Sequence, residues 1–121
     1  MRRQSTRDIG ARYEEKAAAY LSAAGIEILA RNFYCRGGEI DLIGSDGRYL
    51  IFFEVKYRSS KKDGSPFSAI DSGKRRRLFL AARQYLYRQH LPENTPVRFD
   101  AIGILGEELT WLRDAFRETR L

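Results

Sequence analysis

The segment Gly37–Arg58 constrains the fold most, because it has the pattern of two apolar strands joined by an Asp46-Gly47 turn. Three carboxylates fall inside these strands, Glu39 and Asp41 in the first and Glu54 in the second. Strands place hydrophobic side chains toward a core, so acidic side chains at these positions need a compensating charge. The segment therefore predicts a hairpin with a polar site built into it.

A two-residue loop at Asp46-Gly47 predicts a register in which the numbers of paired residues sum to 93, with Glu39 opposite Glu54. Side chains alternate between the two faces of a strand. One face is then predicted to carry Glu39, Asp41, Glu54 and Lys56. The other face is predicted to be uniformly apolar core, with Ile40, Leu42, Ile51, Phe53 and Val55.

Clustered carboxylates on one face of a hairpin repel one another and require a cation. Lys56 supplies one positive charge, and oxygen ligands of this kind suit Mg²⁺ or Mn²⁺. We therefore predict a metal ion held by Asp41 and Glu54, with Glu39 as a third candidate ligand. Lys56 is expected to orient or deprotonate a water, or to stabilise charge on a phosphoryl group. The alternative interpretation is a solvated strand face on which Glu and Lys alternate.

The remaining periodicity predicts a single α/β domain over residues 1–121, with an ordered core over about 8–116. We expect helices over residues 7–24 and from about 68 or 71 to 90, and strands over 26–34, 39–43, 49–57, 97–105 and 108–116. This order, α-β-β-β-α-β-(β), predicts an α+β arrangement in which helices flank a central mixed sheet. Arg98 and Asp100 share one face of the fourth strand and are expected to pair with each other, the alternative being that they support the site.

Charge favours a polyanionic partner. The chain has 22 Lys and Arg against 16 Asp and Glu, a formal net charge of +6 and a pI near 9.7. Such a balance favours a nucleic acid partner. The basic run at the start of the second helix, together with Arg58, supplies candidate phosphate-binding residues. These candidates are Arg58, Lys74, Arg75, Arg76 and Arg77.

The sequence also bears on disulfides, zinc sites and the location of the protein in the cell. Cys35 is the only cysteine and His90 the only histidine, which excludes an internal disulfide and the usual Cys/His zinc sites. A Cys35–His90 nucleophile pair has no local support. No apolar run approaches the roughly 20 residues of a membrane span, and none follows Arg2 and Arg3 as in a secretory leader. We expect no membrane association and a cytoplasmic location.

Two motifs carry a family resemblance, Gly-Glu-Ile-Asp-Leu-Ile over residues 38–43 and Phe-Glu-Val-Lys over residues 53–56. In this order they resemble the PD-(D/E)XK nuclease superfamily, which has the restriction-endonuclease-like fold. More closely, the chain is similar to the YraN family of small bacterial proteins, which are similar to archaeal Holliday junction resolvases.

The resemblance implies roles for four residues. Asp41 and Glu54 would be metal ligands, Lys56 the catalytic lysine, and Glu14 the acid on the first helix that supports the metal site. Tyr13 departs from the glycine that the family often has before this Glu. The implied activity is metal-dependent cleavage of DNA, branched DNA included, and resolvases imply a homodimer by analogy. The alternatives are a nucleic-acid-binding module without catalysis and a scaffold that binds a partner protein.

Overall fold

The computed structural model describes residues 6–118, apart from the side chains of residues 6, 7 and 63. Its elements are α1 (Thr6–Ala23), β1 (Glu27–Cys35), β2 (Gly38–Ser45), β3 (Leu50–Arg58), η1 (Lys61–Asp63), η2 (Pro66–Ala69), α2 (Ser72–Arg88), β4 (Val97–Leu105) and β5 (Glu108–Phe116). The predicted order of helices and strands is confirmed, and the fifth strand is present. No helix within residues 6–118 has the length and apolar character needed to cross a membrane.

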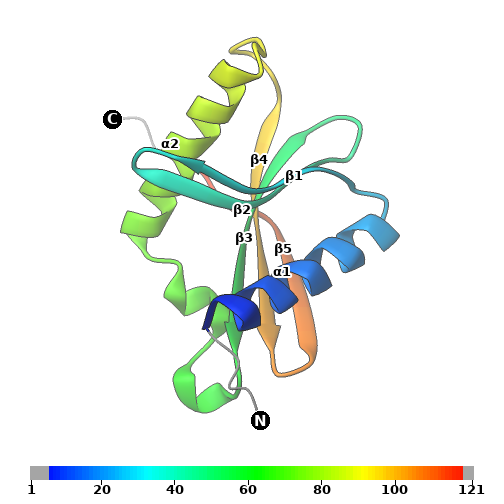
Figure 1. The fold of residues 1–121 in the computed structure, drawn as a ribbon, viewed down its shortest axis with the longest axis vertical. Coiled ribbons are helices and arrows are strands. Elements are labelled where there is room, and N and C mark those ends of the chain that lie inside the picture. Colours follow the sequence, from blue (N-terminus) through cyan, green and yellow to red (C-terminus); the bar gives the residue numbers. More distant parts are fainter. Residues whose placement is uncertain (1–5, 119–121) are drawn as a thin grey trace.

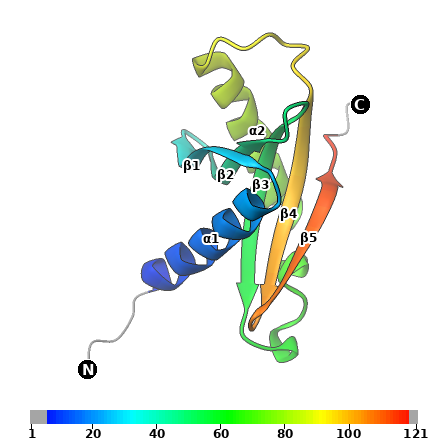
Figure 2. The ribbon, with the colours of Figure 1, turned by 90° about the vertical axis from the view of Figure 1, so that its right-hand side faces the viewer.

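The five strands form one mixed sheet in the order β1-β2-β3-β4-β5 (Figure 1). Neighbouring strands are antiparallel except for β3 and β4, which are parallel. Parallel neighbours need a long crossover connection, and α2 provides it here. Figure 2 shows β3, β4 and β5 along the long axis of the molecule, while the β1–β2 hairpin crosses them.

One face of the sheet is covered by α1. The helix presents Ala17, Ala18 and Leu21, all fully buried, and the two small side chains allow a close approach to the strands. The strand residues in this cluster are Leu42, Ile51, Phe53, Val55, Ile102 and Ile104. The first helix is thereby fixed against the middle of the sheet.

The other face is covered by α2. The Asp71 side chain accepts a 2.9 Å hydrogen bond from the Lys74 amide and caps the start of this helix. The buried helix positions are Leu78, Ala81, Ala82 and Tyr85, and they pack with Ile40, Ile43, Leu50 and Phe52. Because α1 and α2 cover opposite faces, Phe52 and Phe53 are both fully buried, each contributing about 1.5–3 kcal/mol.

The register of the β2–β3 hairpin differs from the predicted one by two residues. Observed pairs run from Leu42↔Phe53 to Ser45↔Leu50, so the residue numbers sum to 95 and Glu39 does not lie opposite Glu54. The reason is the chemistry of the turn, because the Asp46 carboxylate accepts hydrogen bonds from the Arg48 and Tyr49 amides at 2.9 and 2.7 Å. These bonds stabilise a four-residue connection.

The predicted single apolar face is also wrong at one position. Ile40 packs in the cluster beneath α2, whereas Leu42 packs in the cluster beneath α1. Between them, the β1–β2 ladder passes from Arg31↔Leu42 to Phe33↔Ile40 without a pair for Asn32. Asn32 has a φ of +50°, in the left-handed region, which locally changes the direction of the strand. Both strands of the hairpin therefore change faces at this point, next to Asp41.

A buried ion pair secures the outer edge of the sheet. Asp100 on β4 is fully buried and accepts two 2.9 Å bonds from the Arg98 guanidinium, which confirms the predicted pair. Trp111 Nε1 and the Asp114 amide donate to the same carboxylate at 2.9 and 2.8 Å. All of these donors satisfy a charge that would otherwise be costly to bury. The role of the pair is structural, since it fastens β5 to β4.

Candidate active site

The site begins where β2 separates from β3. The ladder between these strands ends at Leu42↔Phe53, and the next residue of β2 is Asp41. Asp41 Oδ2 accepts a 2.8 Å hydrogen bond from the Val55 amide. The Asp41 carboxylate takes the place of the backbone carbonyl that a continuing ladder would supply to the Val55 amide. It therefore lies between β2 and β3 at the point where the two strands separate, which we call the fork.

Glu14 joins this fork from α1. Its carboxylate can accept a hydrogen bond from the Asn32 side chain, and from Asp41 when Asp41 is protonated. Asn32 has a positive φ and lies at the point of the β1–β2 ladder where neither Asn32 nor Asp41 has a paired residue. This break in the regular strand directs the Asn32 side chain toward α1. Asn32 was not among the predicted site residues. An asparagine inside a strand pattern was the available signal, since Asn tolerates positive φ better than most residues.

Two acids in the fork have raised pKa values. Burial raises the pKa of Asp41 well above its ordinary value, and the charges of Glu54 and Glu14 raise it further, while the Val55 amide opposes them. Burial also raises the pKa of Glu14, with the Asn32 and Asp41 hydrogen bonds acting against it. Mutual repulsion among these carboxylates is the electrostatic environment that a bound cation relieves.

Glu54 and Lys56 extend the site along β3. Glu54 is only 8% exposed, and its Oε1 lies 3.1 Å from Lys56 Nζ. Burial lowers the pKa of Lys56, but the neighbouring Lys74, whose amine can accept a hydrogen bond when it is neutral, and the charge of Glu54 outweigh it, so this pKa is raised. The Lys56 ammonium, which can donate to a neutral Lys74 amine, lowers the pKa of Lys74, and burial lowers it further. Lys74 from α2 is thus a second lysine of the site.

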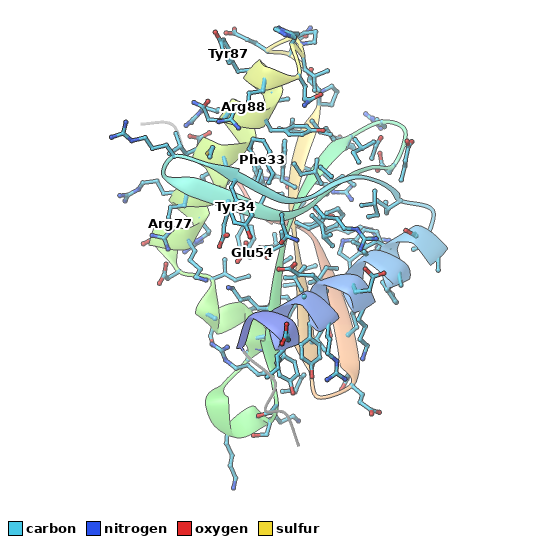
Figure 3. The ribbon with its side chains drawn as sticks, viewed as in Figure 1. Phe33, Tyr34, Glu54, Arg77, Tyr87 and Arg88 are labelled. Carbon is cyan, nitrogen blue, oxygen red and sulfur yellow. The ribbon has the colours of Figure 1, made fainter. Side chains whose placement is uncertain are left out.

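A small cavity of about 50 Å³ opens at this point, lined by Glu39, Glu54, Lys74 and Arg77. Two strands and one helix supply its walls, and Figure 3 shows Arg77 on α2 and Glu54 near the centre of the view. The cavity has room for a few waters. Acidic and basic side chains therefore meet in one place.

The predicted phosphate-binding residues separate into two groups. Lys74 and Arg77 lie three residues apart on one face of α2 and line the cavity. The Arg75 guanidinium lies 6.0 Å from the centre of the Phe116 ring, toward β5. Arg58 donates to the carbonyl of the adjacent Tyr57 at 3.1 Å. Arg76 is exposed on α2 and does not line this cavity.

The donor set suits a hard divalent cation, because Asp41 and Glu54 offer carboxylate oxygens without sulfur or imidazole. Among residues 6–118, however, no three His, Cys, Asp or Glu side chains are grouped closely enough to hold a metal ion by themselves. Mg²⁺ is commonly bound by one or two carboxylates, with water and substrate oxygens completing its shell. A two-carboxylate site completed by substrate fits the residues present.

The Cys35–His90 pair gains no support. Cys35 packs against the cluster beneath α2, and His90 is exposed just after the end of that helix. Within the described part of the chain, no hydrogen bond joins the two side chains. The clustered acidic and basic side chains are instead those around Asp41 and Glu54.

Comparisons with known proteins place the chain in a family. The model of the uncharacterised protein family UPF0102 matches residues 13–104. A UPF0102 protein of Lachnoclostridium phytofermentans is 48% identical over 103 residues, covering 85% of this chain and 87% of that protein. A UPF0102 protein of Nitrosococcus oceani is 43% identical over 121 residues, covering 97% of this chain and 98% of that protein. These matches confirm the resemblance to the YraN family, and the chain belongs to the uncharacterised protein family UPF0102.

Proposed function

We propose that the protein is a divalent-metal-dependent endonuclease that hydrolyses phosphodiester bonds of DNA, with branched DNA among its substrates. The observation that carries this proposal is the convergence of two acids and a lysine in one fork. Asp41 is fixed by the Val55 amide, and Glu54 lies 3.1 Å from the Lys56 ammonium. The order Asp, then Glu-x-Lys, also resembles the PD-(D/E)XK pattern.

Asp41 and Glu54 would hold the metal ion, with Glu14 supporting Asp41 from α1. Glu39 lines the same cavity as Glu54 and could contribute only as an additional ligand. When bound, Mg²⁺ or Mn²⁺ supplies charge for the phosphoryl oxygens and lowers the pKa of a coordinated water. The protein contributes a partly buried position in which these charges act strongly.

Lys56 has the position of the catalytic lysine. Its ammonium group is held beside Glu54, so it can orient an attacking water and stabilise negative charge that develops on the phosphoryl group. Lys74 and Arg77 line the other side of the cavity and can bind the phosphates that flank the scissile bond. The roles are thus divided between β2 and β3, which carry the metal ligands and the catalytic lysine, and α2, which positions the substrate.

A second candidate function is nucleic acid binding without cleavage. The observation that favours it is the charge of α2, which contains six Lys and Arg and no Asp or Glu. This surface can bind phosphates whether or not the fork is catalytically competent. The two candidates predict the same binding and differ only in strand cleavage.

A cleavage panel separates the two candidates. Labelled duplex, single-stranded, flap and four-way-junction DNA are incubated with the full chain and either Mg²⁺ or Mn²⁺. The nuclease proposal predicts metal-dependent cuts that Lys56→Ala removes while DNA binding persists. If wild-type protein binds these substrates in salt-dependent fashion but never cuts them, the binding module is the better account. If none of these DNA forms binds, and single-stranded and duplex RNA do not bind either, both candidates are wrong and a protein-binding scaffold remains.

A further inference from the structure

Tyr34 is an exposed aromatic residue on the edge strand of the sheet. Its relative exposure is 61%, and within residues 6–118 no other aromatic ring lies against it. Tyr57, the other tyrosine near the site, is stacked on Tyr13 with 3.6 Å between ring centroids. Tyr85 is buried among Phe33 and Phe52. Tyr34 is therefore the tyrosine beside the fork that presents an open ring face.

The backbone beneath this ring is held from two sides. Tyr34 pairs with Glu39 across the β1–β2 hairpin. Its carbonyl accepts a 3.4 Å hydrogen bond from Arg88 at the end of α2, and the Arg88 guanidinium lies 5.3 Å from the centre of the Phe33 ring. Two elements thus fix a position whose side chain faces solvent. A ring on a fixed support loses little conformational entropy when a ligand stacks on it.

Register places this ring beside the candidate active site. Directly opposed residues of an antiparallel pair share a face, with Cβ atoms about 4.5–5.5 Å apart, so the side chains of Tyr34 and Glu39 are neighbours. Glu39 in turn lines the cavity with Glu54. Figure 3 shows Phe33, Tyr34 and Glu54 in succession toward the centre of the view. The ring is one residue pair away from the cavity in which the phosphate is proposed to bind.

Charge indicates what kind of ligand approaches this ring. Six of the 22 Lys and Arg are on α2, so the remaining 16 balance the 16 Asp and Glu of the chain. The formal charge of +6 is thus matched by the six basic residues of one helix about 25 Å long, which begins at the cavity with Lys74 and Arg77. An open aromatic ring next to a cationic surface is the combination that binds single-stranded nucleic acid.

Building on the proposed nuclease function, we propose that Tyr34 stacks on an unpaired nucleobase next to the scissile phosphate. The preferred substrate is then DNA with single-stranded nucleotides at the cleavage point, such as a flap, and not continuous duplex. Lys74 and Arg77 bind the adjoining phosphates, while the base leaves the helical stack to lie on the ring. Selectivity arises because a duplex must pay for unstacking and a flap does not.

The experiment measures binding in EDTA, so it does not depend on cleavage. The probe is a DNA flap with 2-aminopurine placed in turn at each nucleotide beside the branch, and a continuous duplex serves as the comparison. Wild-type protein is expected to quench 2-aminopurine at one position. Tyr34→Ala should lose that quenching and bind the flap about 5- to 100-fold more weakly, the range expected for one base–aromatic stack. Duplex binding should not change.

Two variants control for other effects. Tyr34→Phe keeps the ring and should behave as wild type. Tyr87→Ala removes another exposed tyrosine, 79% exposed near the far end of α2, and should leave flap binding unchanged. Thermal unfolding verifies that each variant is folded before its affinity is compared with that of wild type.

Three outcomes overturn the stacking proposal. The first is equal affinity of wild type and Tyr34→Ala for the flap, and the second is an equal loss of affinity for flap and duplex in Tyr34→Ala. The third is a dimer of the wild type that dissociates in Tyr34→Ala, which would make the ring a contact with a second copy. Cleavage of the flap by wild type alongside any of these rejects stacking and leaves the nuclease proposal standing. Quenching that depends on Tyr34, without cleavage in Mg²⁺ or Mn²⁺, rejects the nuclease proposal alone. No binding of DNA at all rejects both.

Discussion

The Val55 amide donates a 2.8 Å hydrogen bond to Asp41 Oδ2 at the point where β2 stops pairing with β3. A single side chain thereby satisfies a backbone donor of the central strand and is itself held in the fork. The same carboxylate has a raised pKa because it is buried near Glu54 and Glu14. The hydrogen bond that Asp41 accepts therefore stabilises the fold, whereas the buried negative charge proposed to bind a metal ion destabilises the metal-free protein.

Substitution of Asp41 separates these two contributions. Asp41→Asn keeps a side-chain oxygen that can accept from the Val55 amide but removes the charge, so the metal-free variant should unfold at a higher temperature than wild type at pH 8. Asp41→Ala leaves the amide without this acceptor, and should be less stable than Asp41→Asn by about 1–3 kcal/mol. Thermal unfolding in EDTA measures both differences. Equal stability of the two variants would show that the hydrogen bond contributes nothing.

The raised pKa of Asp41 predicts a pH dependence of the metal-free protein. The native state binds this proton more tightly than the unfolded state, whose ordinary pKa is 3.8, so the free energy of unfolding falls as pH rises above that value. The fall should continue until pH passes the raised folded-state pKa, and Mg²⁺ should reverse it. Chemical unfolding from pH 4 to pH 8 tests the sign.

Asp41→Asn is the control for this pH series. It should show a smaller fall than wild type over the same range, because the titrating group has been removed. Asp46, Asp71 and Asp114 have lowered pKa values and act in the opposite sense at acid pH, but they are present in both proteins and cancel in the difference. A larger fall in the variant than in wild type would contradict the assignment of the raised pKa to Asp41.

Glu14 and Glu15 are adjacent acids on α1 with different surroundings. Glu14 can accept hydrogen bonds from Asn32 and from a protonated Asp41, whereas Glu15 is exposed and forms an ion pair with Arg31. Glu14→Gln should weaken Mn²⁺ binding by about 10- to 100-fold, the usual effect of losing a group that supports a metal ligand. Glu15→Gln should have no effect. Calorimetric Mn²⁺ titration compares them, and equal affinities would remove Glu14 from the site.

Gly38 tests how the β1–β2 hairpin contacts α2, and Gly10 on α1 is a helix position without such a contact. A Cβ atom added at Gly38 would lie 2.4 Å from the Arg77 carbonyl oxygen, so Gly38→Ala must push the hairpin away from the helix at a cost of about 1–3 kcal/mol. Gly10 on α1 has no atom within 4 Å of such a Cβ, and Gly10→Ala should stabilise the protein by about 0.5–1 kcal/mol. Chemical unfolding measures both. A neutral Gly38→Ala would mean that the contact is not tight in solution.

The sequence predicted those features that depend on local chemistry. Alternation along single strands identified the apolar residues of β3, and the i, i+2 spacing of Arg98 and Asp100 predicted their ion pair. The basic run from Lys74 to Arg77 was predicted to lie at the start of the second helix, and it does. Each of these relationships is fixed by a few neighbouring residues, which is why pattern alone was sufficient.

The features that the sequence did not predict depend on how one strand or helix packs against another. The hairpin register missed by two residues because the Asp46 side chain, and not the Asp-Gly pair alone, determines the length of the connection. Ile40 was assigned to the wrong face because the change of direction originates at Asn32 on the neighbouring strand. The approach of Lys74 to Lys56 depends on how α2 packs on the sheet, which no local pattern encodes.

The most direct test of the proposed active site is the single-turnover cleavage of one end-labelled DNA flap in Mg²⁺ by wild type and by Glu54→Gln. Glu54→Gln keeps the size of a side chain that is only 8% exposed and removes the proposed ligand charge. We predict that wild type cuts the flap and that the variant cuts it on the order of 100-fold more slowly or not at all, with DNA binding retained. Equal cleavage rates for the two proteins, or no cleavage by wild type in Mg²⁺ or Mn²⁺, would contradict the proposal.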